Sequence, residues 1–205
     1  MGFRTDSLVF SKQTHTKNVR VVTEEDRGKG FVRERDYTDV DGLITNVPGL
    51  TLATFYADCV PLFFVDPVHK AIGLSHSGWK GTVGKIGKVT VEKMTEQYGT
   101  DPKDVLAAIG PSICQSCYEV SEDVIVQFRE AFKEEFWTDL FYAKENGKYQ
   151  LNLWRANELI FEEAGILKKH YSTTNICTCC NPGYLFSHRS SLGKRGNLAA
   201  FLQIK

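Results

Sequence analysis

The sequence lacks the features that mark nucleic-acid-binding, membrane and secreted proteins. Its net charge is zero, because 25 Lys and Arg residues balance 25 Asp and Glu residues, and this balance gives no reason to expect an anionic partner. No apolar run reaches the roughly 18 residues that span a bilayer. Residues Met1–Arg4 show no basic segment followed by an apolar stretch, which an export signal would need. We therefore expect a cytoplasmic protein that binds neither nucleic acid nor membranes.

The sequence also lacks internal repeats and low-complexity segments. Its 205 residues, 42% of them hydrophobic and 12% aromatic, suffice for one sizeable core but not comfortably for two, so we expect residues 1–205 to form a single domain. Without an export signal, cysteines favour thiolate chemistry or metal binding over a disulfide framework, while ordinary buried thiols remain an equal alternative. The cysteines are Cys59, Cys114, Cys117, Cys177, Cys179 and Cys180.

The hydrophobic pattern predicts an α+β domain with mixed β-sheets and flanking helices. Two short β-rich segments, Ser7–Phe10 and Val19–Thr23, bracket a polar stretch and place His15 on a loop. Nearly continuous apolar runs predict central strands that are buried on both faces. These runs cover residues 51–57, 60–65 and 71–74; further strands are expected at 105–109, 174–176, 184–187 and 198–204, and helices at about 83–98, 121–132 and 152–164.

Two histidines and one cysteine, His15, Cys59 and His76, could form a zinc site with three protein ligands. Such a site leaves the fourth tetrahedral position for water or substrate. A metal there can lower the pKa of water to about 7 or polarise an oxygen. The separations of the three residues along the chain match no compact zinc motif. Each also has an ordinary interpretation, because a loop histidine can be merely solvated and Cys59 can be a core thiol.

Cys59 and His76 also allow an interpretation without metal. A cysteine next to Asp58, with a histidine on a neighbouring strand, could be the nucleophile and base of a cysteine hydrolase. Metal ligation and nucleophilic attack are competing uses of the same thiolate. The role of His15 therefore discriminates between the two interpretations.

The remaining candidate sites carry weaker signals. Cys114-x-x-Cys117 and Cys177-x-Cys179-Cys180 together could hold a structural zinc ion through four thiolates, but no further spacing rule supports this. A helix that begins after His76 would offer free N–H groups to an anion, although the glycine-rich stretch there lacks the spacing of a nucleoside-triphosphate loop. Arg189 could bind phosphate or a carboxylate through two parallel hydrogen bonds, with a plain surface arginine as the alternative.

Several ordered stretches of the sequence resemble the laccase-domain proteins, also described as polyphenol oxidase-like proteins and as zinc-dependent purine nucleoside phosphorylases. They run in order from residue 13 almost to the end of the chain, and some of them contain Trp or Cys. The matching stretches are Gln13–His15, Asp41–Thr45, Ala57–Leu62, His76–Gly81, Ile109–Ile113 with Cys117–Val120, and Cys177–Thr178 through Ser187–Arg189.

The resemblance implies that His15, Cys59 and His76 are zinc ligands. It implies phosphorolysis of adenosine, inosine, guanosine and methylthioadenosine to base and sugar 1-phosphate, together with deamination of adenosine. It also implies a mixed α+β fold related to cysteine hydrolases. The chain departs from the family pattern at Thr16, Lys80 and residues 193–196, and it begins closer to the first motif than family members usually do.

The implied chemistry assigns provisional roles to other residues. Asp58 is expected to handle a proton during attack at C6 of adenine, or else to orient a ligand. Lys80 and Arg189 are expected to bind phosphate, and Trp79 either stacks on the purine base or fills the core. These assignments are hypotheses about the substrate site.

Three alternatives to the phosphorylase remain open. The older family name suggests copper-dependent oxidation of phenols, although five histidines are too few for a multicopper oxidase. A cysteine hydrolase that uses Cys59 and His76 is the second. The third is a non-catalytic role in peptidoglycan quality control with a structural zinc.

Overall fold

The computed structural model describes residues 4–205 of the chain, and its largest sheet has six strands. The inner pairs β7–β5, β5–β6 and β6–β3 are antiparallel, whereas the outer pairs β11–β7 and β2–β3 are parallel. The predicted mixed sheet is therefore present. In spatial order the strands are β11 (Tyr171–Thr173), β7 (Leu106–Ile109), β5 (Val60–Asp66), β6 (Ala71–Ser77), β3 (Gly42–Thr45) and β2 (Val19–Val21).

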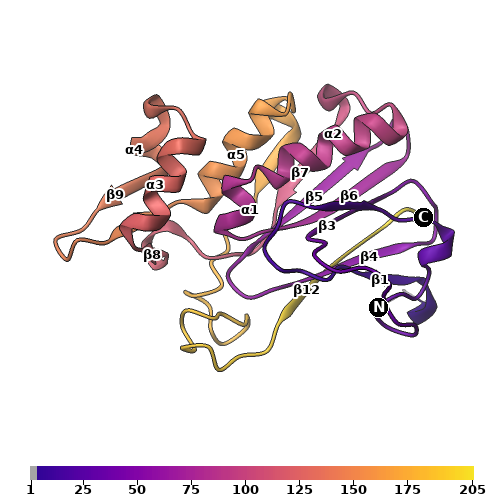
Figure 1. Cartoon of the computed structure of the whole chain (residues 1–205), viewed down its shortest axis with the longest axis horizontal. Coiled ribbons are helices and arrows are strands. Elements are labelled where there is room, and N and C mark those ends of the chain that lie inside the picture. The colour runs from indigo at the N-terminus through magenta and orange to yellow at the C-terminus, as the bar shows by residue number, and fades with distance from the viewer. Residues whose placement is uncertain (1–3) are drawn as a thin grey trace.

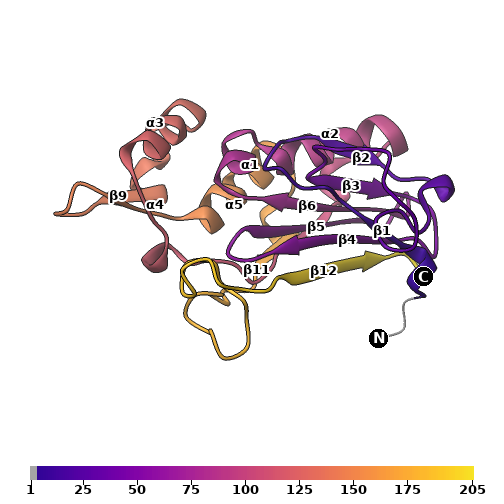
Figure 2. The ribbon, with the colours of Figure 1, turned by 60° about the horizontal axis from the view of Figure 1, so that its bottom comes forward.

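A second, three-stranded sheet lies against one face of the first, as Figure 2 shows. Its central strand β4 (Thr51–Tyr56) pairs in parallel with β1 (Leu8–Phe10) and antiparallel with β12 (Leu198–Gln203). Fully buried apolar side chains from both sheets fill the space between them, among them Leu43, Leu52 and Leu74. The strand at 51–56 was expected beside the other central strands, but the structure places it in this second layer.

Helices cover the opposite face of the six-stranded sheet (Figure 1). They are α1 (Trp79–Val83), α2 (Ile86–Tyr98) and α5 (Leu153–Glu163), and the rings of Phe64 on β5 and Phe161 on α5 meet edge to face at 5.4 Å. Gly99 ends α2 in the left-handed conformation, with φ of +74°, so this helix stops at the predicted limit of about residue 98. Within residues 4–205, no helix combines the length and apolar character that a bilayer crossing requires.

A small outlying lobe extends from one end of the molecule (Figure 1). It contains a three-stranded antiparallel sheet and two helices, and it follows directly on the segment that carries Cys114 and Cys117. The elements are β8 (Glu119–Val120), α3 (Glu122–Ala131), α4 (Trp137–Leu140), β9 (Phe141–Ala143) and β10 (Tyr149–Leu151). Short 3-10 helices connect other elements at Thr5–Ser7, Glu24–Asp26, Pro102–Asp104, Gln115–Cys117, Glu134–Phe136 and Lys168–His170.

Two strand predictions near the C-terminus are wrong. Residues 184–187 form turns in a long loop, where Tyr184 is 91% exposed and Phe186 is 49% exposed. Their apolar character therefore does not mark a core strand. Residues 174–176 lie just beyond the end of β11 and do not extend it as a strand. Their contact with β7 is the hydrogen bond that Thr174 N donates to Ile109 O. The α+β class with mixed sheets is confirmed, while the relation to cysteine hydrolases stays a prediction.

Candidate metal centre

Three side chains from distant parts of the chain converge at one end of the six-stranded sheet. His15 lies on the loop between β1 and β2, Cys59 directly precedes β5, and His76 lies near the end of β6. One ligand atom from each residue lies within 4.8 Å of the other two. The Cys59 Sγ to His15 Nε2 distance is 3.9 Å, and the two imidazole rings lie edge to face at 5.0 Å. These three residues are called the histidine centre below.

Strand register and backbone conformation explain this convergence. The β5–β6 hairpin pairs Val60 with Ser77, so Cys59 and His76 emerge at the same end of the sheet. Asp58 has a left-handed backbone, with φ of +79°, which redirects the chain just before Cys59. Gly78 leaves room for the group, because a Cβ there would lie 2.9 Å from His15 Cδ2 and 3.2 Å from Cys59 Sγ.

A fully buried carboxylate, Asp41, holds two members of the histidine centre. Its Oδ1 accepts hydrogen bonds from the His15 backbone N–H at 3.0 Å and from His76 Nδ1 at 2.8 Å. Its Oδ2 accepts from the backbone N–H groups of Thr14 and Thr16 and from the Thr16 hydroxyl. Because Nδ1 of His76 is engaged in this way, Nε2 is the atom left for a metal.

Electrostatics in the histidine centre favour the charged forms of its members. Burial by itself would raise the pKa of the Cys59 thiol, but hydrogen bonds with His15 and His76 outweigh it and lower that pKa to about 6. Burial likewise opposes the charged form of His76, yet Asp41 and Cys59 raise its pKa to about 9. Burial also opposes ionisation of Asp41, but its hydrogen bonds to His76 and to the loop lower the pKa to about 2.

The histidine centre lines a surface cavity of about 350 Å³. His76 is only 4% exposed, whereas Cys59 is half-buried and His15 is exposed, so the group opens from the protein interior towards solvent. The described residues that line the cavity include three cationic side chains and the aromatic side chains of Phe55 and Tyr56. The cations are Lys12, Arg35 and Arg195.

Asp58 and Arg189, predicted to act in the site, are joined to each other. The Asp58 Oδ2 accepts the backbone N–H of Arg189 at 2.7 Å, and its Oδ1 accepts the Thr178 hydroxyl at 2.7 Å. The Arg189 guanidinium donates to the backbone carbonyl of Glu119 at 2.9 Å and lies 5.3 Å from the centre of the Tyr118 ring. Both carboxylate oxygens of Asp58 therefore hold the C-terminal loop in place.

Trp79 and Lys80, also predicted to bind substrate, open α1 just after the histidine centre. Trp79 is partly buried and packs against the core under the helices, and the Lys80 Nζ lies 5.5 Å from the centre of the Trp79 ring. Of the described residues around the cavity, the lining set contains neither of them, nor Arg189. Their assignment to substrate binding stays a prediction.

Several residues of this region escaped the sequence-based analysis. Asp41 was noted only as part of the Asp41–Thr45 stretch, although a carboxylate within a stretch that resembles a family of metal proteins was a usable signal for a histidine partner. Lys12, Arg35 and Arg195 belong to no motif, and only the folded chain brings them to one cavity.

The fold and the centre together define the class of this protein: an α+β domain in which a loop and a buried hairpin together present a His–Cys–His group, able to hold a metal ion, to an open cavity. The chain belongs to the multi-copper polyphenol oxidoreductase laccase family, whose pattern matches residues 1–205. The resemblance seen in the sequence is thereby confirmed.

Individual relatives agree with this assignment. The chain is 41% identical over 211 residues to purine nucleoside phosphorylase YlmD of Bacillus subtilis (strain 168), which covers 99% of this chain and 73% of that protein. It is 35% identical over 193 residues to adenosine deaminase RL5 of an unknown prokaryotic organism, covering 92% and 72% of the two chains. The crystal structure of the hypothetical protein YfiH of Bacillus licheniformis matches with a TM-score of 0.94 at 35% identity, covering 100% of this chain and 76% of that one.

Proposed function

We propose that this chain is a zinc-dependent purine nucleoside phosphorylase that also deaminates adenosine. Its substrates are adenosine, inosine, guanosine and methylthioadenosine, with phosphate as the second substrate. The observation that carries the proposal is the convergence of His15, Cys59 and His76 at a cavity lined by cations and aromatic rings. The names of the relatives, purine nucleoside phosphorylase and adenosine deaminase, support the same chemistry. We place the enzyme in the cytoplasm, as one domain that spans residues 1–205.

The donor set of the histidine centre fits zinc. Two imidazole nitrogens and one thiolate are common zinc ligands, and three protein ligands are typical of catalytic rather than structural sites. The Asp41 carboxylate behind His76 is the usual partner of a metal-binding histidine. Zinc held by these residues would supply Lewis acidity next to the substrate and leave one coordination position open.

Phosphorolysis joins a phosphate oxygen to the sugar C1′ while the bond from C1′ to the base nitrogen breaks, and the leaving base takes up a proton. We assign phosphate binding to Lys12, Arg35 and Arg195, because all three line the cavity beside the histidine centre. The candidates from the sequence, Lys80 and Arg189, do not line this cavity. The Lys80 side chain lies over the Trp79 ring, and the Arg189 side chain contacts Tyr118 and the Glu119 carbonyl.

The purine base needs an apolar wall, and we assign this role to Phe55. Its side chain is 40% exposed, lines the cavity and stacks on Phe10 with ring centres 5.1 Å apart, so it offers a supported aromatic face. Deamination replaces the C6 amino group of adenine by water-derived oxygen and releases ammonia. The two hydrogen bonds on Asp58 favour its orienting role beside Cys59 over proton transfer.

The test is a direct assay of the purified 205-residue chain. Bound metal is measured, and inosine and adenosine are followed by chromatography with and without phosphate. We expect hypoxanthine release from inosine that depends on phosphate and disappears in Cys59→Ala and His76→Ala. His170→Ala serves as the matched histidine control, because this half-buried side chain bonds the Lys103 carbonyl and does not line the cavity. Equal hypoxanthine release without phosphate would contradict phosphorolysis.

A cysteine hydrolase is the second candidate, because the pKa of Cys59 is lowered to about 6. This pKa would provide a thiolate at neutral pH for nucleophilic attack. The discriminating variant is His15→Ala, since a metal site needs this ligand and a Cys59–His76 pair does not. Full activity of His15→Ala, with a covalent adduct on Cys59, would favour the hydrolase.

Copper-dependent phenol oxidation finds less support in the arrangement of histidines. Of the five, His69 bonds Asp66, His170 bonds the Lys103 carbonyl and His188 is exposed on the C-terminal loop, which leaves His15 and His76 in the histidine centre. Two histidines cannot ligate the several copper ions of a multicopper oxidase. Oxidation of a phenol by the copper-loaded protein is the assay for this activity. A purely structural role in peptidoglycan quality control predicts that no nucleoside is consumed in any of these assays.

A further inference from the structure

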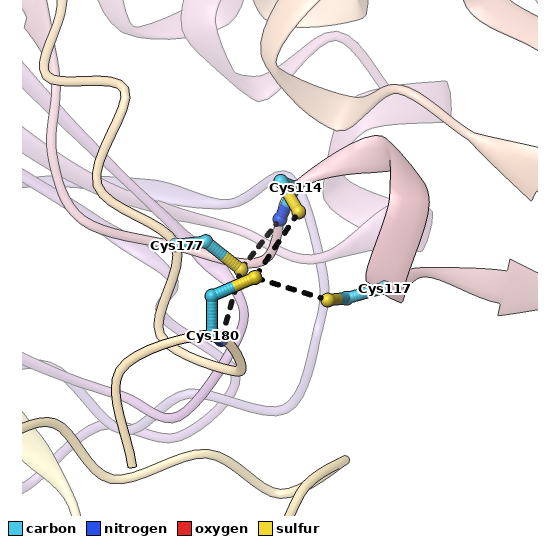
Figure 3. A group of neighbouring side chains, drawn as sticks. All are labelled: Cys114, Cys117, Cys177 and Cys180. Carbon is cyan, nitrogen blue, oxygen red and sulfur yellow. Dashed lines mark hydrogen bonds between the residues drawn. The ribbon is translucent and has the colours of Figure 1, made fainter. Parts of the chain in front are cut away.

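Four cysteine sulfurs gather at a second place, away from the cavity that the histidine centre lines. Cys114, Cys117, Cys177 and Cys180 each offer a Sγ atom, and these four atoms lie within 4.8 Å of one another (Figure 3). The Cys180 Sγ lies 3.4 Å from that of Cys117 and 4.0 Å from that of Cys114. This group is called the cysteine cluster below.

The spacing of the sulfurs fits four ligands around one ion better than two disulfides. Zn–S bonds of about 2.3 Å place the sulfurs of a tetrahedral site about 3.8 Å apart. A disulfide would need a sulfur separation of about 2.05 Å, and Cys180 approaches two partners, only one of which it could bond. All six cysteines of the chain are free thiols in the structure. The short distances between the four sulfurs also leave no space for the several irons and sulfides of an iron–sulfur cluster.

The backbone on both sides of the cysteine cluster is arranged for thiolates. Cys114 immediately precedes the 3-10 turn Gln115–Cys117 and Cys117 is its last residue, and Cys177 and Cys180 have the same two-residue spacing around a second turn. The Cys177 Sγ accepts backbone N–H groups from Cys114 at 3.3 Å and from Cys180 at 3.4 Å. Such N–H donors stabilise the negative charge that sulfur carries when it binds a metal. Each pair has the C-x-x-C spacing that is common in four-thiolate zinc sites, and the fold brings together the two pairs, which lie far apart along the chain.

Local backbone pairing holds the two turns together. Ser112 N donates to Ile176 O at 3.1 Å, and Thr178 N donates to Ser112 O at 3.2 Å, which forms a short parallel bridge between Ser112 and Cys177. The bridge is short and lies between a segment before the outlying lobe and the start of the long C-terminal loop. This single bridge links the two segments only weakly. A metal ion bound by the four sulfurs would add a stronger cross-link between them.

We propose that Cys114, Cys117, Cys177 and Cys180 bind a structural zinc ion that fastens the C-terminal loop to the segment before β8. Two consequences follow from the contacts of this loop. Thr178, between the ligands, bonds Asp58 next to Cys59, and the same loop later supplies Arg195 to the cavity. The ion thus holds the C-terminal wall of the cavity without taking part in the reaction.

The test counts metal in the whole 205-residue chain, refolded or expressed with Zn²⁺. We expect about two zinc ions per wild-type chain, about one in Cys59→Ala, and about one in the double variant Cys114→Ser with Cys180→Ser. Cys179→Ser is the matched control, because Cys179 lies in the same turn but outside the cluster, and it should retain about two. An unchanged metal content in the double variant overturns the proposal.

A second measurement does not depend on how the double variant folds. Co²⁺ replaces Zn²⁺ in the Cys59→Ala chain, which keeps all four cluster cysteines. We expect the intense sulfur-to-cobalt charge-transfer absorption of a tetrahedral thiolate site, and protection of four thiols from alkylation that a strong chelator abolishes. Absence of this absorption, iron in place of zinc, or a disulfide between cluster cysteines found by mass spectrometry in the freshly purified wild-type chain would each overturn the proposal.

Discussion

The histidine centre and the cysteine cluster both bring cysteine to a group of potential metal ligands, but their surroundings differ. The histidine centre has three potential ligands, a buried carboxylate behind one of them and a cavity of about 350 Å³ in front. The cysteine cluster has four thiols, joined by two turns and backbone N–H groups. An incomplete ligand set beside a cavity suits chemistry, whereas a complete set between two chain segments suits cross-linking.

This difference also shows in how each group is supported. Asp41 positions the histidine centre by accepting from His76 and from three consecutive backbone N–H groups of the Thr14–Thr16 loop. Within the described part of the chain, the sulfurs of the cluster bond backbone N–H groups and the Ser116 hydroxyl, and no carboxylate plays the part of Asp41. Loss of a histidine-centre ligand should therefore affect activity most, and loss of a cluster ligand should affect stability most.

The largest effect is expected from removing a ligand of the histidine centre. Cys59→Ala or His76→Ala should lower kcat/KM for phosphate-dependent cleavage of inosine by about 1000-fold, or about 4 kcal/mol of transition-state stabilisation, because the bound metal is lost. Steady-state kinetics with added Zn²⁺ measures this effect. Thermal unfolding of the same variants should shift little, since the cysteine cluster stays intact. A stability loss as large as the activity loss would erase the distinction between the two groups.

The reverse pattern is expected for the cysteine cluster. The double variant Cys114→Ser with Cys180→Ser should lose about 3 kcal/mol of stability, which corresponds to a fall in Tm of about 6–12 °C for a chain of this size. Its kcat at low temperature should change much less than that of Cys59→Ala. Differential scanning calorimetry of the double variant and of the control Cys179→Ser measures the difference in Tm. Equal Tm values for these two variants would count against a structural ion.

A smaller effect on the histidine centre is expected from Asp41→Asn. The amide keeps the size of the side chain but loses the negative charge that faces His76 and the loop N–H groups. Zinc affinity should fall about 10- to 100-fold, as is usual when the partner of a metal-binding histidine is altered. Competition with a chromophoric chelator measures this change. Asp39→Asn is the control, because the exposed Asp39 bonds the Thr14 hydroxyl and not a residue of the histidine centre. Equal zinc affinities of the two variants would show that Asp41 does not support metal binding.

The sequence predicts features that depend on neighbouring residues better than features that depend on contacts between distant segments of the chain. Local patterns predict β5, β6 and the end of α2 at Gly99, because apolar runs and a terminating glycine are local signals. They fail for residues 184–187, whose aromatic side chains stay exposed in a loop. Tertiary packing, rather than local propensity, decides such segments.

The same reasoning applies to the sites. His15, Cys59 and His76 were predicted through family motifs, since their separation along the chain matches no compact zinc motif. The role of Asp41 depends on the register of β3 against β6, where His76 N donates to Asp41 O at 2.7 Å, and no local pattern contains that register. The cysteine cluster depends on the bridge between Ser112 and Cys177, which joins segments on either side of the outlying lobe.

The smallest effect, and the sharpest test of the close packing in the histidine centre, is expected from Gly78→Ala. The backbone of Gly78 has φ of −74°, so alanine is not strained there, and only the new Cβ matters. That Cβ would lie 2.9 Å from His15 Cδ2 and 3.2 Å from Cys59 Sγ, which forces the imidazole to move by a few tenths of an ångström. Overpacking of this kind costs about 1–3 kcal/mol.

We expect kcat/KM of Gly78→Ala to fall up to about 10-fold because His15 is displaced from its ligand position. Gly183→Ala is the matched control, since a Cβ at Gly183 meets no atom within 4 Å and should leave activity unchanged. The distinction between the two groups predicts that zinc in the cysteine cluster is retained in full by both variants. If Gly78→Ala keeps wild-type activity, His15 has more freedom than the structure gives it, and its place among the metal ligands would have to be given up.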